Sequence, residues 1–174
     1  MPEDFQEDGL DEVAYALSKQ NPEGVQALKR YLDAADLERR RSALYFLAFP
    51  DIADEQIRAT LIREFNSGEP TLKRCALWGF IHLDFFPLER AALSVFLHGE
   101  DQRLAALAMV YLSRACPDDS LRILREALQS SNPRMREYAC DEIGDRDFDV
   151  LKNEMRTLLG DTDPNVAAAA ASNL

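Results

Sequence analysis

Two parts of the sequence carry residue types that bind metal ions. Residues 145–149 read Asp-Arg-Asp-Phe-Asp, the alternating carboxylates that open a calcium-binding loop. The loop's sixth position is Val150 instead of glycine and its twelfth is Arg156 instead of glutamate, so a helix connection with capping carboxylates is favoured. His82 and His98 are sixteen residues apart and have no third ligand at the spacing of a zinc site. We therefore expect no metal site and no other cofactor.

Residues that could catalyse a reaction are also few. Asp141 and Asp145 are four residues apart on one predicted helix face, where two carboxylates could act as acid and base. Acidic helix surfaces often place carboxylates in this way by chance, and the sequence has neither a nucleophile elbow nor a glycine-rich phosphate loop. The three cysteines, Cys75, Cys116 and Cys140, form no C-x-x-C pair, which is typical of reduced thiols in the cytoplasm. We expect a cytoplasmic protein that is not an enzyme.

The charge of the chain limits the partners it can bind. Thirty-one acidic and twenty basic residues give a net charge of -11, so the average surface repels phosphate groups. General binding to nucleic acid is therefore not expected. Residues 39–130 are neutral, with twelve acidic and twelve basic residues, and the two ends of the chain are acidic. No apolar stretch reaches the roughly 18 residues needed to cross a membrane.

The elements that must position these residues are predicted to be helices. Apolar residues recur at helical spacing, strand-like alternation is absent, and proline or glycine separates the periodic segments. The predicted helices cover residues 10–19, 22–33, 37–49, 52–66, 70–83, 87–98, 101–115, 118–130, 133–144, 148–159 and 164–174. Residues 1–9 form an acidic, disordered N-terminus in this interpretation, and residues 10–174 form one domain.

Five of these helices repeat one pattern at intervals of 33, 32, 31 and 31 residues. The residues that open them are N-cap types, namely Asp36, Glu69, Asp101, Asn132 and Asp163. Seven residues after each opening residue stands alanine: Ala43, Ala76, Ala108, Ala139 and Ala170. Eleven residues after it stands a large apolar residue: Leu47, Phe80, Leu112, Ile143 and Leu174. Small residues let neighbouring helices approach closely while large ones fill the seam, which predicts stacked helix pairs.

The segments that begin Asp163-Pro164-x-Val166 and Asn132-Pro133-x-Met135 resemble the second helix of HEAT repeats, specifically the short bacterial kind also found in bilin lyases. The resemblance covers about residues 20–174 and implies an all-α, right-handed α-solenoid of about five helix pairs. The second helices lie near residues 37–49, 70–83, 101–115, 133–144 and 164–174, and residues 10–19 form an extra capping helix. The first pair departs most from the pattern.

In HEAT-like arrays the second helices line the concave side, so their outward positions are candidates for binding. Counting the opening residue as position 1, packing uses positions 4, 8, 11 and 12, and positions 3, 6, 10 and 14 should face outward. An aromatic and arginine strip then passes into an acidic one, comprising Arg41, Tyr45, Phe49, Arg74, Trp78, His82, Val110, Asp141 and Asp145. Tyr45 and Trp78 can equally be interpreted as core residues, since tryptophan is usually well buried.

We expect a protein-binding module whose concave face holds a protein partner, most specifically an inhibitor or immunity-type protein that neutralises a basic partner. The alternative is a HEAT-like enzyme, such as an alkylpurine DNA glycosylase or a bilin lyase. The charge disfavours the glycosylase, and no residues carry over to the lyase. Val166, Ala170 and Leu174 form an apolar stripe with no following pair to cover it, which predicts weak self-association through residues 148–174.

Overall fold

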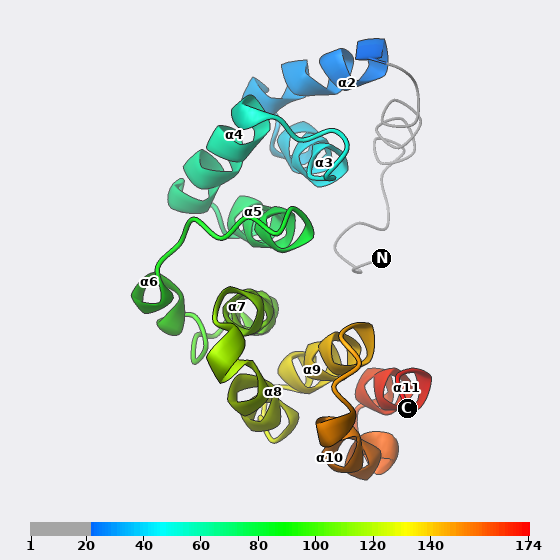
Figure 1. The fold of residues 1–174 in the computed structure, drawn as a ribbon. Coiled ribbons are helices and arrows are strands. Elements are labelled where there is room, and N and C mark those ends of the chain that lie inside the picture. Colours follow the sequence, from blue (N-terminus) through cyan, green and yellow to red (C-terminus); the bar gives the residue numbers. More distant parts are fainter. Residues whose placement is uncertain (1–21) are drawn as a thin grey trace. The chain divides into compact units, whose positions relative to one another are not determined.

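The computed structural model describes residues 22–174, and all regular elements in that range are helical (Figure 1). The predicted acidic segment 1–9 and capping helix 10–19 lie outside the described residues. Contacts group the chain into two compact units, of which unit 1 ends at Pro87 and unit 2 is Leu88–Leu174. Each unit has its own buried interior. Within the described range, no helix is both long enough and apolar enough to span a bilayer.

Unit 1 is built around α5, which packs against both α3 and α4. Its elements are α2 (Pro22–Lys29), the 3-10 turn η2 (Arg30–Asp33), α3 (Leu37–Leu47), α4 (Glu55–Asn66) and α5 (Pro70–His82). The interior consists of fully buried apolar side chains from these helices, such as Leu44, Leu61, Leu77 and Phe80. The helices α3 and α5, which the repeat pattern predicted to be second helices of successive pairs, are therefore neighbours in space.

Unit 2 is built around α7 and α9, which pack against each other and against α8. Its elements are α6 (Arg90–Ser94), α7 (Gln102–Ala115), η3 (Pro117–Asp119), α8 (Ser120–Leu128), α9 (Pro133–Asp145), η4 (Asp149–Leu151), α10 (Lys152–Arg156), η5 (Thr157–Gly160) and α11 (Pro164–Ser172). Because α11 also packs on α9, the helices α7, α9 and α11 are successive neighbours.

The five predicted opening residues all cap their helices. Each side chain accepts a hydrogen bond from a backbone N–H in the first turn, at 2.9 to 3.2 Å for the donor and acceptor atoms. In α5, α9 and α11 proline follows at the first helical position, where its missing N–H costs nothing. The repeated N-cap prediction is confirmed, and these caps fix the starts of α3, α5, α7, α9 and α11.

The repeated alanines are also where the sequence predicted them, because all five are fully buried. Of the large residues four positions later, Leu47, Phe80, Leu112 and Ile143 are buried as well. Leu174 departs from the pattern, since it follows the end of α11 and is 38% exposed. The last repeat therefore lacks the final apolar contact that the sequence pattern predicted.

Several predicted helices are shorter or broken. The predicted helix 87–98 contains only the five helical residues of α6, and the predicted helix 148–159 is divided into η4, α10 and η5. The predicted helix 37–49 ends at Leu47 because Ala48 leaves the helical backbone conformation. The predicted helix 52–66 begins at Glu55, since Asp54 caps it, and the predicted helix 118–130 is the turn η3 followed by α8.

The C-terminal stripe is not exposed. Val166 and Ala170 are fully buried, because α11 packs on α9. The expectation that these residues form an uncovered apolar surface is therefore wrong, and of the stripe only Leu174 contacts solvent substantially.

Close contacts explain two glycines within the helices. A Cβ atom on Gly79 of α5 would lie 2.8 Å from Leu61 Cδ2 and 3.1 Å from Ala48 Cβ, so glycine lets α4 approach α5. A Cβ atom on Gly144 of α9 would lie 2.1 Å from Asn173 Oδ1, just beyond the end of α11. Both glycines permit helix contacts that any larger residue would obstruct.

Candidate functional site

Four aromatic rings of unit 1 form one group, which we call the aromatic cluster: Tyr45 of α3, Phe49 just beyond the end of α3, and Trp78 and His82 of α5. The centroids of Tyr45 and Trp78 are 4.2 Å apart in a stacked arrangement, and those of Trp78 and His82 are 3.6 Å apart and also stacked. The Phe49 ring stands edge-on to Trp78 at 5.9 Å and to His82 at 6.3 Å. Positions 10 and 14 of two successive repeats thus meet in one place, as their register predicted.

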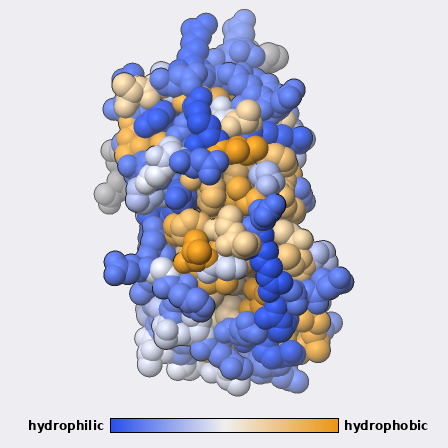
Figure 2. Space-filling model, turned by 90° about the vertical axis from the view of Figure 1, so that its left-hand side faces the viewer, coloured by the Kyte–Doolittle hydropathy of each residue, from blue (hydrophilic) through white to orange (hydrophobic). Residues whose placement is uncertain are grey.

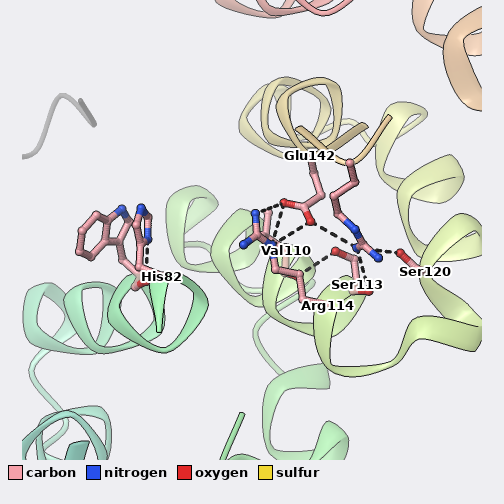
Figure 3. A network of polar contacts seen from close by, with 8 residues as sticks. His82, Val110, Ser113, Arg114, Ser120 and Glu142 are labelled. Atoms are coloured by element: carbon pink, nitrogen blue, oxygen red, sulfur yellow. Dashed lines mark hydrogen bonds and ion pairs between the residues drawn. The ribbon is translucent and has the colours of Figure 1, made fainter. Parts of the chain in front are cut away.

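The aromatic cluster has a buried base and an exposed rim. Tyr45 is 7% exposed and Trp78 is 8% exposed, so the expectation that position 10 faces outward is wrong for both. They are buried because each ring is covered by the neighbouring helix and by the next ring of the stack. Phe49 is 37% exposed, and His82 is exposed as well. His82 Nδ1 lies 3.1 Å from the carbonyl oxygen of Trp78, which fixes the imidazole over the indole (Figure 3).

Each of the two arginines of the predicted strip donates a hydrogen bond to a side chain of its own helix. Arg41 is only 5% exposed, so the expectation that it faces outward is wrong, and its Nε donates to Glu38 Oε2 at 2.7 Å. Arg74 is half-buried and its Nη2 donates to Thr71 Oγ1 at 3.3 Å. In both helices position 6 therefore bonds to position 3, one turn earlier.

The remaining residues of the predicted strip are Val110, Asp141 and Asp145, which belong to unit 2. Of these three, only the two aspartates are exposed. Val110 is 7% exposed and packs in the interior, so its predicted outward orientation is wrong. Asp141 Oδ1 accepts a hydrogen bond from Asn173 Nδ2 at 3.0 Å. Desolvation by the surrounding protein raises the pKa of Asp141. The hydrogen bond from Asn173 lowers this pKa, and the negative charges of Glu137 and Asp145 raise it.

Unit 2 contains a buried ionic network that was not predicted from the sequence. Glu142, which is 3% exposed, accepts from Arg114 through both carboxylate oxygens, with Nε–Oε1 at 2.9 Å and Nη2–Oε2 at 2.8 Å (Figure 3). Arg146 Nη1 lies 3.3 Å from Glu142 Oε1, 3.1 Å from Ser120 Oγ and 3.2 Å from the carbonyl oxygen of Ser113. The network joins α7, α8 and α9.

A signal for this network was present in the repeat. Position 11 is a packing position, occupied by Phe46 and Tyr111 in two other repeats, and Glu142 stands there in the fourth. A carboxylate at a packing position requires a cation nearby, because burial of an unpaired charge costs several kcal/mol. Arg114, at position 14 of the preceding repeat, is the side chain that supplies it.

The motif at residues 145–149 is a helix connection. Arg146 lies 4.5 Å above the Phe148 ring, and Asp149 Oδ1 accepts from Lys152 Nζ at 2.8 Å. Within residues 22–174 no group of three or more histidine, cysteine or acidic side chains is placed to hold a metal ion. None of the three cysteines, all of which lie in the described range, forms a disulfide, and burial raises the pKa of the Cys140 thiol to about 12, which keeps it protonated at neutral pH.

Solved structures with a similar fold are known. The structure is similar to the crystal structure of an engineered protein from the Northeast Structural Genomics Consortium, with a TM-score of 0.52 and 16% sequence identity. The match covers 95% of this chain and 87% of that one. No family model and no curated protein matches this sequence. At this level of identity the similarity concerns the fold alone.

Proposed function

We propose that this chain is a HEAT-like α-solenoid that acts as a non-catalytic module for holding a protein partner. The repeat architecture is supported within each unit, because α3 neighbours α5 in unit 1 and α7, α9 and α11 are successive neighbours in unit 2. The shared N-caps and buried alanines give these second helices one register. Stacked helix pairs present extended surfaces, which suit protein partners.

The observation that carries the binding proposal is the exposed rim of the aromatic cluster. Phe49 is the one aromatic residue among the large apolar side chains that are prominently exposed in the described range. It is held against Trp78 and beside the exposed His82. Aromatic side chains fixed in advance lose little conformational entropy on binding, which makes them effective anchors.

The charge of the chain indicates the chemistry of the partner. A net charge of -11 attracts a basic protein and accelerates its approach. The most specific form of the proposal is an inhibitor or immunity-type protein that neutralises a basic partner, with the exposed Asp141 and Asp145 contributing to the attraction. Cysteines that form no disulfide are compatible with action in a reducing compartment such as the cytoplasm.

Photo-crosslinking from the rim tests the proposal. A photoreactive phenylalanine analogue is placed at position 49, and in a matched variant at position 56, which is exposed on α4. A specific basic protein should crosslink from position 49 and not from position 56. With that partner purified, Phe49→Ala should weaken binding by about 1 to 2 kcal/mol, while Gln56→Ala should leave it unchanged. Trp78→Ala is a poorer test, because Trp78 is buried and its loss would disturb unit 1.

Three results would overturn the proposal. The first is crosslinking to the same partner with equal yield from positions 49 and 56. The second is binding that Phe49→Ala does not change while the fold stays intact. The third is release of bases from alkylated DNA by the purified protein, with loss of that activity in Asp141→Asn, and it would favour the HEAT-like enzyme.

A further inference from the structure

The exposed rim of the aromatic cluster lies where two helices of unit 1 end. Phe49 is two residues beyond the end of α3, and His82 is the last residue of α5. The backbone carbonyl groups at such ends carry a partial negative charge, which favours a cation nearby. Many helices meet this preference with lysine or arginine in the last turn, but α3 has no basic residue there and α5 has only His82. The rim therefore favours a cation that the last turns of these helices do not supply as lysine or arginine.

An exposed aspartate follows each rim residue at the same spacing. Asp51 is two residues beyond Phe49, and Asp84 is two residues beyond His82. Two residues of chain span at most about 7 Å, which is less than the roughly 10 Å over which charges act at 0.1 M salt. Among residues 22–174, neither carboxylate has a hydrogen-bond or ion-pair partner. Both negative charges therefore add to the field at the rim.

The two arginines of the predicted strip do not cancel this field. Arg41 and Arg74 occupy position 6 of their repeats, eight residues before the rim position, which is about 12 Å along a helix. The charge of Arg41 is also balanced by Glu38, which accepts from it at 2.7 Å. No arginine or lysine of the described residues lies over the Phe49 ring. The surface around Phe49 thus combines an exposed aromatic ring with negative charge.

The chain itself shows which cation such a surface accommodates. Arg58 of α4 lies 5.5 Å from the centre of the Phe85 ring, directly after Asp84. In unit 2, Arg146 lies 4.5 Å from the centre of the Phe148 ring in the same way. The guanidinium group is planar and weakly hydrated, so it stacks on aromatic faces more readily than the ammonium group of lysine does.

The outer side of α4 has no comparable surface. Its exposed residues carry both signs and include Glu55, Arg58 and Arg63. Figure 2 shows this side of the molecule, on which hydrophilic areas are prominent. A cationic group gains little from charges of mixed sign, whereas at the rim the described charges nearest in sequence are negative.

We propose that the rim binds an arginine side chain of the basic partner, with the guanidinium group packed on Phe49 and attracted by Asp51 and Asp84. This inference rests on the proposed function, because it names the chemical group that the partner places at the rim. Phe49 is held in advance against Trp78 at 5.9 Å, which lowers the entropy cost of the contact.

Nuclear magnetic resonance of the intact, nitrogen-15-labelled protein tests the assignment with an acetylated and amidated Gly-Arg-Gly tripeptide. The tripeptide should cause saturable shifts of backbone amides in residues 49–53 and 82–86, with a millimolar dissociation constant. The same tripeptide with citrulline, which resembles arginine in shape and has no charge, should bind about fivefold more weakly. Phe49→Leu should raise the dissociation constant for the arginine tripeptide about threefold, because leucine keeps an apolar contact and lacks the ring face.

The contribution of the aspartates is measured with two double variants. Asp51→Asn combined with Asp84→Asn should raise the dissociation constant at least about threefold at low salt. Asparagine also adopts the positive φ of 45° found at Asp84, so the backbone is preserved. The matched control combines Asp118→Asn with Asp147→Asn, which removes two charges from exposed aspartates of unit 2. It should leave the dissociation constant within about 1.5-fold.

Three results overturn the inference: no saturable shift of these amides up to about 50 mM tripeptide, equal binding of the citrulline tripeptide, or an equal effect of the two double variants. Each of them leaves the proposed function standing if a basic protein still crosslinks from position 49, because a different group of that partner then occupies the rim. Failure of the crosslinking overturns the proposed function itself, whatever the tripeptide does.

Discussion

The buried carboxylate of Glu142 balances the charges of two arginines in unit 2. Its carboxylate is 3% exposed and holds Arg114, which is 26% exposed, and Arg146, which is 28% exposed. Glu142→Gln removes the negative charge and leaves two partly buried guanidinium groups without it. We expect a loss of about 2 to 3 kcal/mol in the free energy of unfolding, measured by urea denaturation.

Glu126 provides the matched control for this change. It pairs with Arg122 on the surface of α8, where both side chains are at least half exposed. Glu126→Gln should therefore change the free energy of unfolding by no more than about 0.5 kcal/mol. If the two variants have the same stability, the buried network contributes nothing beyond an ordinary surface pair.

Two aspartates of unit 2 should respond to pH with opposite signs. Hydrogen bonding to Arg136 is the main cause that lowers the pKa of Asp161, whereas desolvation is the main cause that raises the pKa of Asp141. Ionised Asp161 therefore stabilises the fold above the unfolded value of about 3.9, and this contribution is lost as pH falls through the lower folded pKa. Ionised Asp141 costs stability at neutral pH, and that cost disappears as pH falls below its raised folded pKa.

Urea denaturation of two single variants measures these signs. At pH 7, Asp161→Asn should destabilise the protein by about 2 kcal/mol, since the Arg136–Asp161 pair is bidentate and its side chains are 14% and 8% exposed. Asp141→Asn should be neutral or stabilising at pH 7, because the amide oxygen still accepts from Asn173. Both differences from wild type should shrink at pH 3. Destabilisation of equal size by both variants at pH 7 would contradict the assignment.

At the scale of the helices, the repeated alanine is the contact that sets the distance between neighbours. Ala139 of α9 is fully buried, and α9 packs against α7, α8 and α11. Ala139→Leu should overpack this position and destabilise the protein by about 1 to 3 kcal/mol. Ala168→Leu is the control, because Ala168 is exposed on α11 and should tolerate leucine within about 0.5 kcal/mol. Thermal or urea unfolding of both variants measures the difference.

The helix starts could be predicted from the sequence because they depend on local chemistry. An N-cap such as Asp101 bonds to a backbone N–H three residues away. A proline directly after the cap, such as Pro133 after Asn132, fits the first turn of any helix. The reduction of residues 87–98 to α6 could not be predicted, because its apolar residues lie on all sides and periodicity does not show which face packs. In the structure only Leu93 packs fully.

The sequence predicted which residues form the aromatic cluster, but it did not predict how deeply they are buried. Repeat register brings Tyr45 beside Trp78, since both occupy position 10 of successive second helices. Register does not show how closely α3 and α5 approach, and that distance decides whether the rings stack beneath the surface. The ionic network at Glu142 depends likewise on which arginine of a neighbouring helix reaches it, which helical periodicity alone leaves open.

At the scale of the whole molecule, the division into two compact units predicts two unfolding transitions. Each unit has its own buried interior, and in stacked-repeat proteins stability is a sum of local terms and nearest-neighbour terms. Trp78 is the single tryptophan of the chain and lies in the core of unit 1. Its fluorescence therefore reports the unfolding of unit 1, while far-ultraviolet circular dichroism reports the helices of both units.

Glu142→Gln separates the two transitions because it weakens unit 2 alone. In urea, the midpoint measured by circular dichroism should fall and the transition should broaden, whereas the midpoint measured by Trp78 fluorescence should move much less. A variant of unit 1 gives the converse result: Leu61→Ala, at a fully buried position of α4, should lower the fluorescence midpoint most, by a change of about 2 to 5 kcal/mol in that unit. If both probes shift equally in both variants, the two units unfold as one cooperative body, and the coupling between them exceeds the difference in their separate stabilities.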